Sequence, residues 1–192
     1  MAAQRPPHAA PALRGEAHCL PLRDRSVDAA MTVLSLHHWE GRQEQGVREL
    51  RRVARGPVVI VTYEPAICEQ MWLVKDYLPE LAELDAKTTP STSELATWLG
   101  GCSRVAVVPV SRDTPDWTLM SFWAHPERVL DRSARNATSG FARMPTDIVE
   151  RVVAAVQSDL EDGTWDRRHG HLRQLREYDA GLRLLVDTPA RA

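Results

Sequence analysis

The sequence contains few cysteines, no long apolar run and no excess of charge of either sign. Its three cysteines lie far apart among 192 residues, which excludes a disulfide framework and a zinc site built on Cys-x-x-Cys. The longest uninterrupted apolar run covers residues 152–156, whereas a transmembrane helix needs about 20 apolar residues. The N-terminal residues include no apolar stretch of signal-peptide length. We therefore expect a cytoplasmic protein with reduced thiols and no membrane partner.

The charge balance argues against a nucleic-acid partner. Lysine and arginine number 24 against 26 aspartate and glutamate, a net charge of −2, and binding to phosphates normally requires a basic excess. The hydrophobic fraction of 43% and the charged fraction of 26% are those of a globular protein, so disorder throughout is excluded.

The first half of the chain predicts a βαβ unit. Residues 27–34 and 58–62 are mostly apolar without strict alternation, as in strands that are buried on both faces. Between them, residues 42–55 have an amphipathic helical pattern that Gly56 and Pro57 end. A strand, a helix and a strand in this order predict two parallel strands with a right-handed crossover.

The rest of the chain predicts more helices than strands. Residues 65–84 favour a helix that Pro79 kinks or ends, and Ser91 and Glu94 form a capping box at the start of a short helix. Strands are expected at 105–110 and 117–123. From Pro145 onward two helical stripes are expected, at 148–160 and 172–185.

One segment resembles a known family. Residues 15–21, Gly-Glu-Ala-His-Cys-Leu-Pro, precede Val27-Asp28 and then Leu34-Ser-Leu-His-His-Trp39. This order resembles the middle of class I S-adenosylmethionine-dependent methyltransferases, and more narrowly the type 11 group that acts on small molecules. Arg48-Glu-Leu-Arg-Arg-Val53 is similar to that group's next helix. The resemblance is specific over residues 12–63 and weaker toward the C-terminus.

The resemblance implies roles for eight residues. Glu16 and Ala17, just after an expected short strand, would meet the adenine edge of S-adenosylmethionine, and Leu34, Ser35 and Leu36 would lie beside its methionine part. His37 would be the catalytic base, because a neutral imidazole can take a proton from a hydroxyl or amine. The residues expected to contact the substrate are His38 and Trp39.

The family's glycine-rich Gly-x-Gly loop is missing upstream of the first recognisable strand. The sequence therefore predicts an α/β, Rossmann-like methyltransferase fold that lacks the first strands and this loop, with helical insertions and a helical C-terminus. We expect one N-terminally truncated domain over 1–192, consisting of an irregular segment or short helix at 1–13, a sheet core with a helical insertion at 14–123 and a helical region at 124–192. With strands missing, an exposed apolar sheet edge is expected to favour self-association.

The predicted function is methyl transfer from S-adenosylmethionine to a small-molecule acceptor, with substrate selection by residues 65–90 and 111–145. The alternative is a non-catalytic, methyltransferase-like protein that binds a partner or a small ligand. A metal hydrolase using His169 and His171 is a third reading, but no third ligand of suitable spacing is evident, and no metal is expected.

Overall fold

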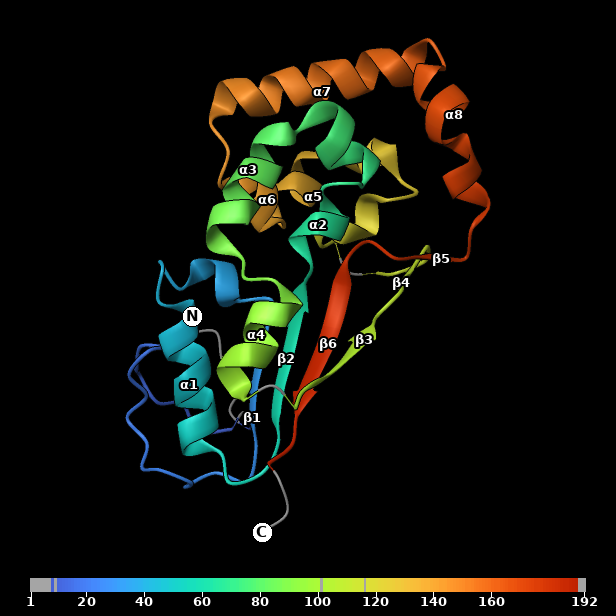
Figure 1. Ribbon diagram of the computed structural model, residues 1–192. Coiled ribbons are helices and arrows are strands. Elements are labelled where there is room, and N and C mark those ends of the chain that lie inside the picture. The colour runs from blue at the N-terminus through green and yellow to red at the C-terminus, as the bar shows by residue number, and fades with distance from the viewer. Residues whose placement is uncertain (1–7, 9, 101, 116, 190–192) are drawn as a thin grey trace.

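A four-stranded sheet and a helical cap make up the protein (Figure 1). The computed structural model describes residues 8, 10–100, 102–115 and 117–189. The strands are β1 (Ala30–Val33), β2 (Val58–Tyr63), β3 (Arg104–Val107), β4 (Val110–Ser111), β5 (Glu177–Tyr178) and β6 (Leu182–Asp187). The α-helices are α1 (Gln43–Val53), α2 (Pro65–Cys68), α3 (Pro79–Thr88), α4 (Thr92–Leu99), α5 (Arg132–Asn136), α6 (Ser139–Ala142), α7 (Thr146–Glu161) and α8 (Thr164–His169).

Shorter helical turns connect these elements. The 3-10 turns are η2 (Leu36–His38), η4 (Leu119–Phe122), η5 (Pro126–Val129) and η6 (Gly170–Gln174), and η3 (Leu73–Tyr77) is a π-helical turn. None of the helices in the described part of the chain has both the length and the apolar character needed to cross a membrane.

The main sheet has the strand order β1-β2-β6-β3. β1 is parallel to β2, which confirms the predicted βαβ unit, whereas β6 is antiparallel to both β2 and β3. β4 and β5 form a separate two-stranded sheet. Because β1 and β2 run in the same direction, their carboxyl ends meet at one edge of the sheet, which is where open α/β sheets bind ligands.

Tight backbone packing closes the loop from α1 to β2. A Cβ atom on Gly56 would overlap the carbonyl oxygen of Asp28. Arg51 donates from Nη2 to the carbonyl oxygens of Ala54 and Gly56, and from Nη1 to the buried Asp187 of β6 at 3.1 Å. This arginine therefore ties the end of α1 to the central strand.

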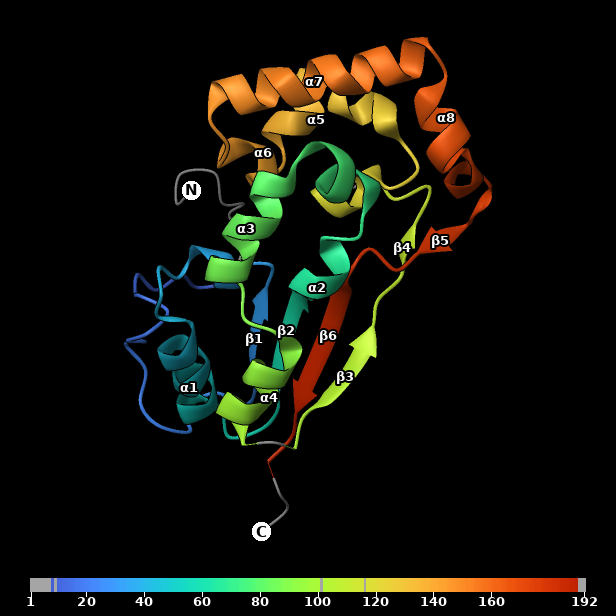
Figure 2. The ribbon, with the colours of Figure 1, turned by 45° about the horizontal axis from the view of Figure 1, so that its top comes forward.

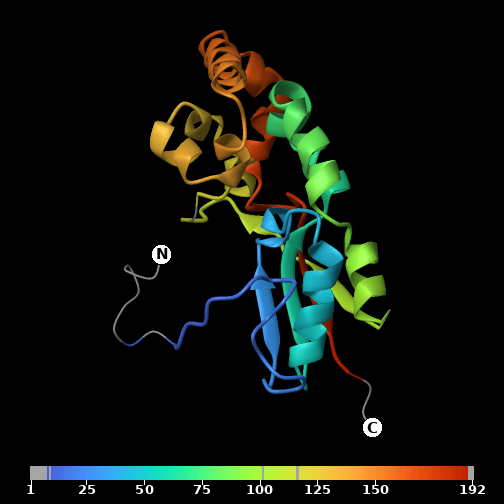
Figure 3. The same cartoon turned by 90° about the vertical axis from the view of Figure 1, so that its left-hand side faces the viewer.

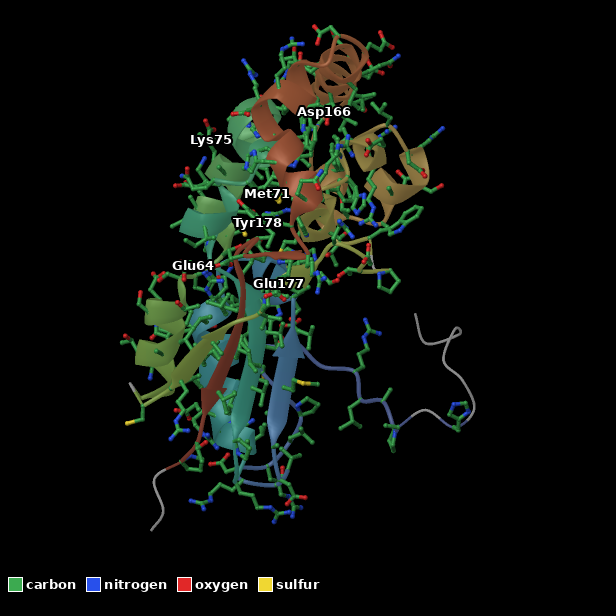
Figure 4. All side chains as sticks on the ribbon, turned by 90° about the vertical axis from the view of Figure 1, so that its right-hand side faces the viewer. Glu64, Met71, Lys75, Asp166, Glu177 and Tyr178 are labelled. Atoms are coloured by element: carbon green, nitrogen blue, oxygen red, sulfur yellow. The ribbon has the colours of Figure 1, made fainter. Side chains whose placement is uncertain are left out.

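The helical cap covers the carboxyl ends of β1 and β2. Figure 2 shows α3 and α6 above these ends, with α7 across the top. The largest apolar cluster lies inside this cap and contains Trp72, Phe122, Trp123 and Trp165. At the junction between the cap and the sheet, Glu177 and Tyr178 of β5 are labelled in Figure 4, and the Tyr178 ring stacks on Trp123 at 5.4 Å.

Two predicted elements are wrong. Residues 117–123 were expected to form a strand, but Leu119–Phe122 is a 3-10 turn, in which Phe122 and Trp123 turn into the cap core. The helical C-terminus holds only as far as Gln174, because the chain then forms β5 and β6. Gly181, at φ +95°, makes the turn before β6, and a Cβ there would lie 2.5 Å from Cys68 Sγ.

Two other expectations differ in extent. Pro79 does not end a long helix but begins α3, after the π-helical turn η3. No strand precedes Glu16 among the described residues 8 and 10–15, and Glu16 makes only an isolated bridge to Cys19. The predicted strand at 105–110 is divided between β3 and β4, whereas the capping box of α4 is confirmed, with both of its hydrogen bonds formed. Residues 1–7 and 9 of the segment expected to be irregular or a short helix lie outside the described residues.

Helices cover only one face of the main sheet in the described part of the chain. In Figure 3 the sheet is seen close to edge-on, with α1 and α4 on one side and the extended segment before β1 on the other. On the second face Met31 is 66% exposed and Val33 is 50% exposed. The register places Val59 and Val61 of β2 next to them, so this face is apolar.

Candidate active site

A cavity of about 230 Å³ lies between the carboxyl ends of the strands and the helical cap. We call it the first cavity. Its wall at the strand ends consists of Leu34, His37 and Tyr63. The remaining lining residues are Cys68, Val74, Leu81, Asp85, Thr118, Leu119, Met120, Ala137, Thr138, Ser139, Gly140 and Arg143. All of these twelve belong to the two segments, 65–90 and 111–145, in which substrate selection was predicted.

Close approach of two walls shapes the first cavity at Gly140. A Cβ atom there would lie 2.8 Å from Leu119 Cδ1 and 3.2 Å from Leu81 Cδ2. Glycine therefore lets α6 pack directly against residues of α3 and η4, and any side chain at this position would displace both leucines.

His37 is the predicted base, and the structure keeps it neutral at pH 7. Its side chain lies in η2, only 9% exposed, with the Ser139 Oγ 3.2 Å from Nε2. Burial lowers its pKa to about 4, helped by the positive charge that His38 and Arg143 would present to an imidazolium. A neutral imidazole has one nitrogen with a free lone pair, which can accept a proton.

A hydrogen-bonded network of side chains adjoins His37 in the first cavity. The Tyr63 ring lies 5.8 Å from the His37 ring, and its hydroxyl donates to Asp85 Oδ1 at 3.0 Å. Arg143 also reaches Asp85 Oδ1, at 3.3 Å, and donates to Thr88 at 2.9 Å. Burial, as the largest cause, raises the pKa of both Tyr63 and Asp85. The network therefore joins α3 to β2 beside the candidate base.

A second cavity, of about 340 Å³, lies on the other side of η2 and is more polar. Its lining residues are Glu16, Ala17, His18, His38, Trp39, Glu40 and Arg42. Glu16 Oε2 pairs with His18 Nε2 at 2.8 Å, and Arg42 also contacts that ring nitrogen. Trp39 packs on Gly46 of α1, where a Cβ would lie 2.5 Å from the indole ring.

The structure divides the eight residues of the predicted site between three places. Leu34 and His37 line the first cavity, whereas Glu16, Ala17, His38 and Trp39 line the second. Ser35 and Leu36 line neither: the Ser35 hydroxyl lies 2.6 Å from that of Thr32, and Leu36, only 1% exposed, packs in the core beneath α1. η2 thus forms a wall between the two cavities and directs His37 into the first and His38 into the second. It places the predicted substrate residues His38 and Trp39 beside the predicted adenine contacts.

Sequence reasoning missed Tyr63, Asp85, Ser139 and Arg143. Only Tyr63 had a usable signal, because it ends a buried strand at the ligand-binding edge of a parallel pair. The other three come from segments without a recognisable motif, and only packing of the cap brings them to the strand ends.

The described residues contain no group of three histidine, cysteine, aspartate or glutamate side chains that could hold a metal ion. His169, which had suggested a metal ligand, instead pairs with Asp76 at 2.8 Å.

Comparison with known proteins agrees with the fold. Residues 1–61 match the family model described as a methyltransferase domain. No functionally curated protein matches the chain in sequence.

The chain is also similar to a solved structure from Anabaena variabilis ATCC 29413, described as a "putative methyltransferase from antibiotic biosynthesis pathway". The two are 29% identical, with a TM-score of 0.83 over 92% of this chain and 72% of that one. The likeness thus extends from the βαβ unit through the helical cap that encloses the first cavity. The family match over residues 1–61 and this structural match together support a class I S-adenosylmethionine-dependent methyltransferase.

Proposed function

We propose that this chain transfers a methyl group from S-adenosylmethionine to a hydroxyl group of a small, largely apolar molecule bound in the first cavity. The observation that carries the proposal is the position of His37, a buried neutral base at the strand ends with a mostly apolar cavity beside it. S-Adenosylmethionine, when bound, supplies an electrophilic methyl group whose carbon–sulfur bond breaks as the new oxygen–carbon bond forms.

The chain's own residues fit part of that cofactor. Glu16 and Ala17 line the second cavity, which offers a carboxylate for the adenine amino group. Leu34 follows β1 with φ +46°, an uncommon conformation for a residue with a side chain, and such strain is concentrated at ligand sites. Glu16 and Ala17 would therefore hold the adenine end of the cofactor in the second cavity, and Leu34 would lie beside its methionine part at the edge of the first. Gly-x-Gly occurs nowhere in the sequence, so the usual turn beneath the methionine part is not supplied by these residues.

The protein's contribution to the reaction would be placement and proton removal. The apolar walls of the first cavity exclude water, which strengthens the interactions of the reacting groups. The acceptor hydroxyl donates to the free nitrogen of His37 and passes its proton there as the oxygen is methylated. Ser139 holds the imidazole in place through the other ring nitrogen.

The absence of Gly-x-Gly favours the second candidate, a non-catalytic protein that binds a partner or small ligand. Loss of several hydrogen bonds of about 0.5–1.5 kcal/mol each would weaken a micromolar cofactor site to about millimolar. We therefore expect no calorimetric binding of S-adenosylmethionine at about 100 µM, the range in which a micromolar site would be saturated.

The deciding experiment supplies methyl-labelled S-adenosylmethionine at millimolar concentration with a panel of naphthols, alcohols and amines. Labelled methyl ether products that form with the chain and disappear with His37→Ala support transfer. If no acceptor gives a labelled product at saturating cofactor, the proposal of methyl transfer is contradicted. The non-catalytic binding function then remains.

A further inference from the structure

The first cavity contains a second polar group that the proposed reaction does not use. Asp85 lines this cavity and is only 7% exposed. The hydrogen bonds that Asp85 accepts from Tyr63 and from Arg143 both end on Oδ1. Within the described ranges, Oδ2 has no hydrogen-bond partner. Because Oδ2 is not among the fully enclosed unpaired atoms, it is open to the first cavity and can accept a hydrogen bond from a bound ligand.

The charges around this atom argue for a neutral ligand. Asp85 and Arg143 form an ion pair whose charges cancel, and His37 is neutral at pH 7 because its pKa is about 4. The rest of the lining is mainly aliphatic, with Leu34, Val74 and Leu81 among its residues. An ionic ligand would lose its hydration without gaining an unpaired counter-charge.

Tyr63 contacts both polar groups of the cavity, His37 and Asp85. Its ring lies beside His37 and its hydroxyl lies on Asp85. His37 and Asp85 are thus two acceptor groups in the same cavity, with Tyr63 in contact with both. One ligand that satisfies both carries two hydrogen-bond donors on an apolar frame that suits the aliphatic lining.

We propose that Asp85 is a specificity-determining residue that selects neutral acceptors with two hydroxyl groups, one directed to His37 and the other donated to Asp85 Oδ2. This inference rests on the proposed function for the fate of the first hydroxyl. The second hydroxyl is not methylated but fixes the orientation of the frame. Selection by Asp85 should therefore act on binding even when no cofactor is present.

The test uses three fluorescent probes of the same shape: 2,7-dihydroxynaphthalene, 7-methoxy-2-naphthol and 2,7-dimethoxynaphthalene. Titration of the purified chain by fluorescence should give at least about tenfold tighter binding of the dihydroxy probe than of the dimethoxy probe, since a hydrogen bond to a charged group is worth that factor or more. Asp85→Asn should reduce this preference by about fivefold, because the amide keeps only a neutral hydrogen bond while the bond to His37 remains.

A matched control is available in the cap. The Tyr77 hydroxyl donates to Asp159 at 2.6 Å, a second tyrosine–aspartate pair that lies outside the lining of the first cavity. Asp159→Asn should leave the preference between the probes unchanged. Because the three probes are compared on the unaltered chain, the inference stays testable if Asp85→Asn does not fold.

The outcomes separate the inference from the proposed function. Equal binding of the three probes, no binding of any, or a preference that folded Asp85→Asn does not reduce would overturn the role of Asp85. If the preference for two hydroxyl groups is found but no probe or other acceptor is methylated, the binding inference stands and the proposed reaction is wrong. If acceptors with two hydroxyl groups are methylated with a kcat/KM that Asp85→Asn does not change, the reaction stands and the inference is wrong.

Discussion

His37 owes its neutral state to where η2 places it, between a buried strand end and the helical cap. In an unfolded chain its pKa would be 6.5, whereas burial lowers it to about 4 in the folded protein. The unfolded state therefore binds a proton at a higher pH than the folded state does. Stability is lost as the pH falls from about 6.5 to about 4, and this loss can reach about 3 kcal/mol for one group.

His37→Gln should remove this contribution to the pH dependence. We expect the free energy of unfolding of the unaltered chain to fall more steeply between pH 6.5 and pH 4 than that of the variant. Urea denaturation of both proteins at several pH values measures the difference, in which contributions of other titrating groups cancel. Parallel curves would show that His37 has an ordinary pKa.

The two adjacent histidines should differ in their effect on turnover. His37 lines the first cavity and His38 the second, so the acceptor can reach only His37. With saturating cofactor, His37→Ala should lower kcat by about 100-fold or more, the usual contribution of a general base. His38→Ala should change kcat little. Steady-state rates of labelled methyl transfer provide the comparison, and equal small effects of both substitutions would leave the pair a structural role.

The β1–α1–β2 unit depends on Gly56, where the loop from α1 to β2 meets the backbone just before β1. Gly56→Ala would push a methyl group into the Asp28 carbonyl and should lower the free energy of unfolding by about 1–3 kcal/mol, as overpacking does. Gly170→Ala is the control, because its nearest contact, to the Asp166 side chain, is an ordinary 3.6 Å. Chemical denaturation would contradict the prediction if both variants were equally stable.

The elements that the sequence predicted correctly are those whose pattern was unambiguous. Residues 58–62 are continuous and β-branched, and the apolar stripe of α1 has no strand-like alternative. In contrast, Leu175, Leu182 and Leu185 repeat at helical spacing, although residues 182–187 alternate between the two faces of a strand. The strand is set apart from a helix by the turn at Gly181 and by its close contact with Cys68. That contact depends on tertiary structure, so the local sequence does not predict it.

The candidate site also contains residues that the sequence could locate and residues that it could not. The resemblance placed Leu34 and His37 because they follow directly from a recognisable strand. Asp85 and Arg143 could not be located, because their meeting depends on how α3 packs against the segment after α6. Local sequence predicts the strand ends, whereas the cap that completes the cavity is set by long-range packing.

For the whole molecule, the open face of the main sheet is the feature that bears on solution behaviour. Met31 and Val33 are exposed on β1, the outermost strand of the sheet, and no lysine or proline of β1 protects this edge. We predict that the chain self-associates through this face. Light scattering after size-exclusion chromatography should give a mass above that of one chain, and Met31→Lys with Val33→Lys should lower it.

The control for this prediction uses apolar residues that are exposed elsewhere. Leu130 and Leu175 are 37% and 40% exposed, so changing both to lysine adds the same charge without altering the open face. A monomer of the unaltered chain that melts cooperatively at high concentration would contradict the prediction. So would an equal effect of the two double substitutions.

The position of β6 affects how the protein can be made in a cell. β6 pairs with β2 on one side and β3 on the other, yet it comes from residues 182–187, far along the chain from β2. At about 5–20 residues per second, a ribosome needs roughly 6–24 s to travel from one strand to the other. During that interval the inner edge of β2 has no partner, and it is apolar. The main sheet can therefore be completed only late in synthesis, and until then β2 keeps an apolar edge without a partner.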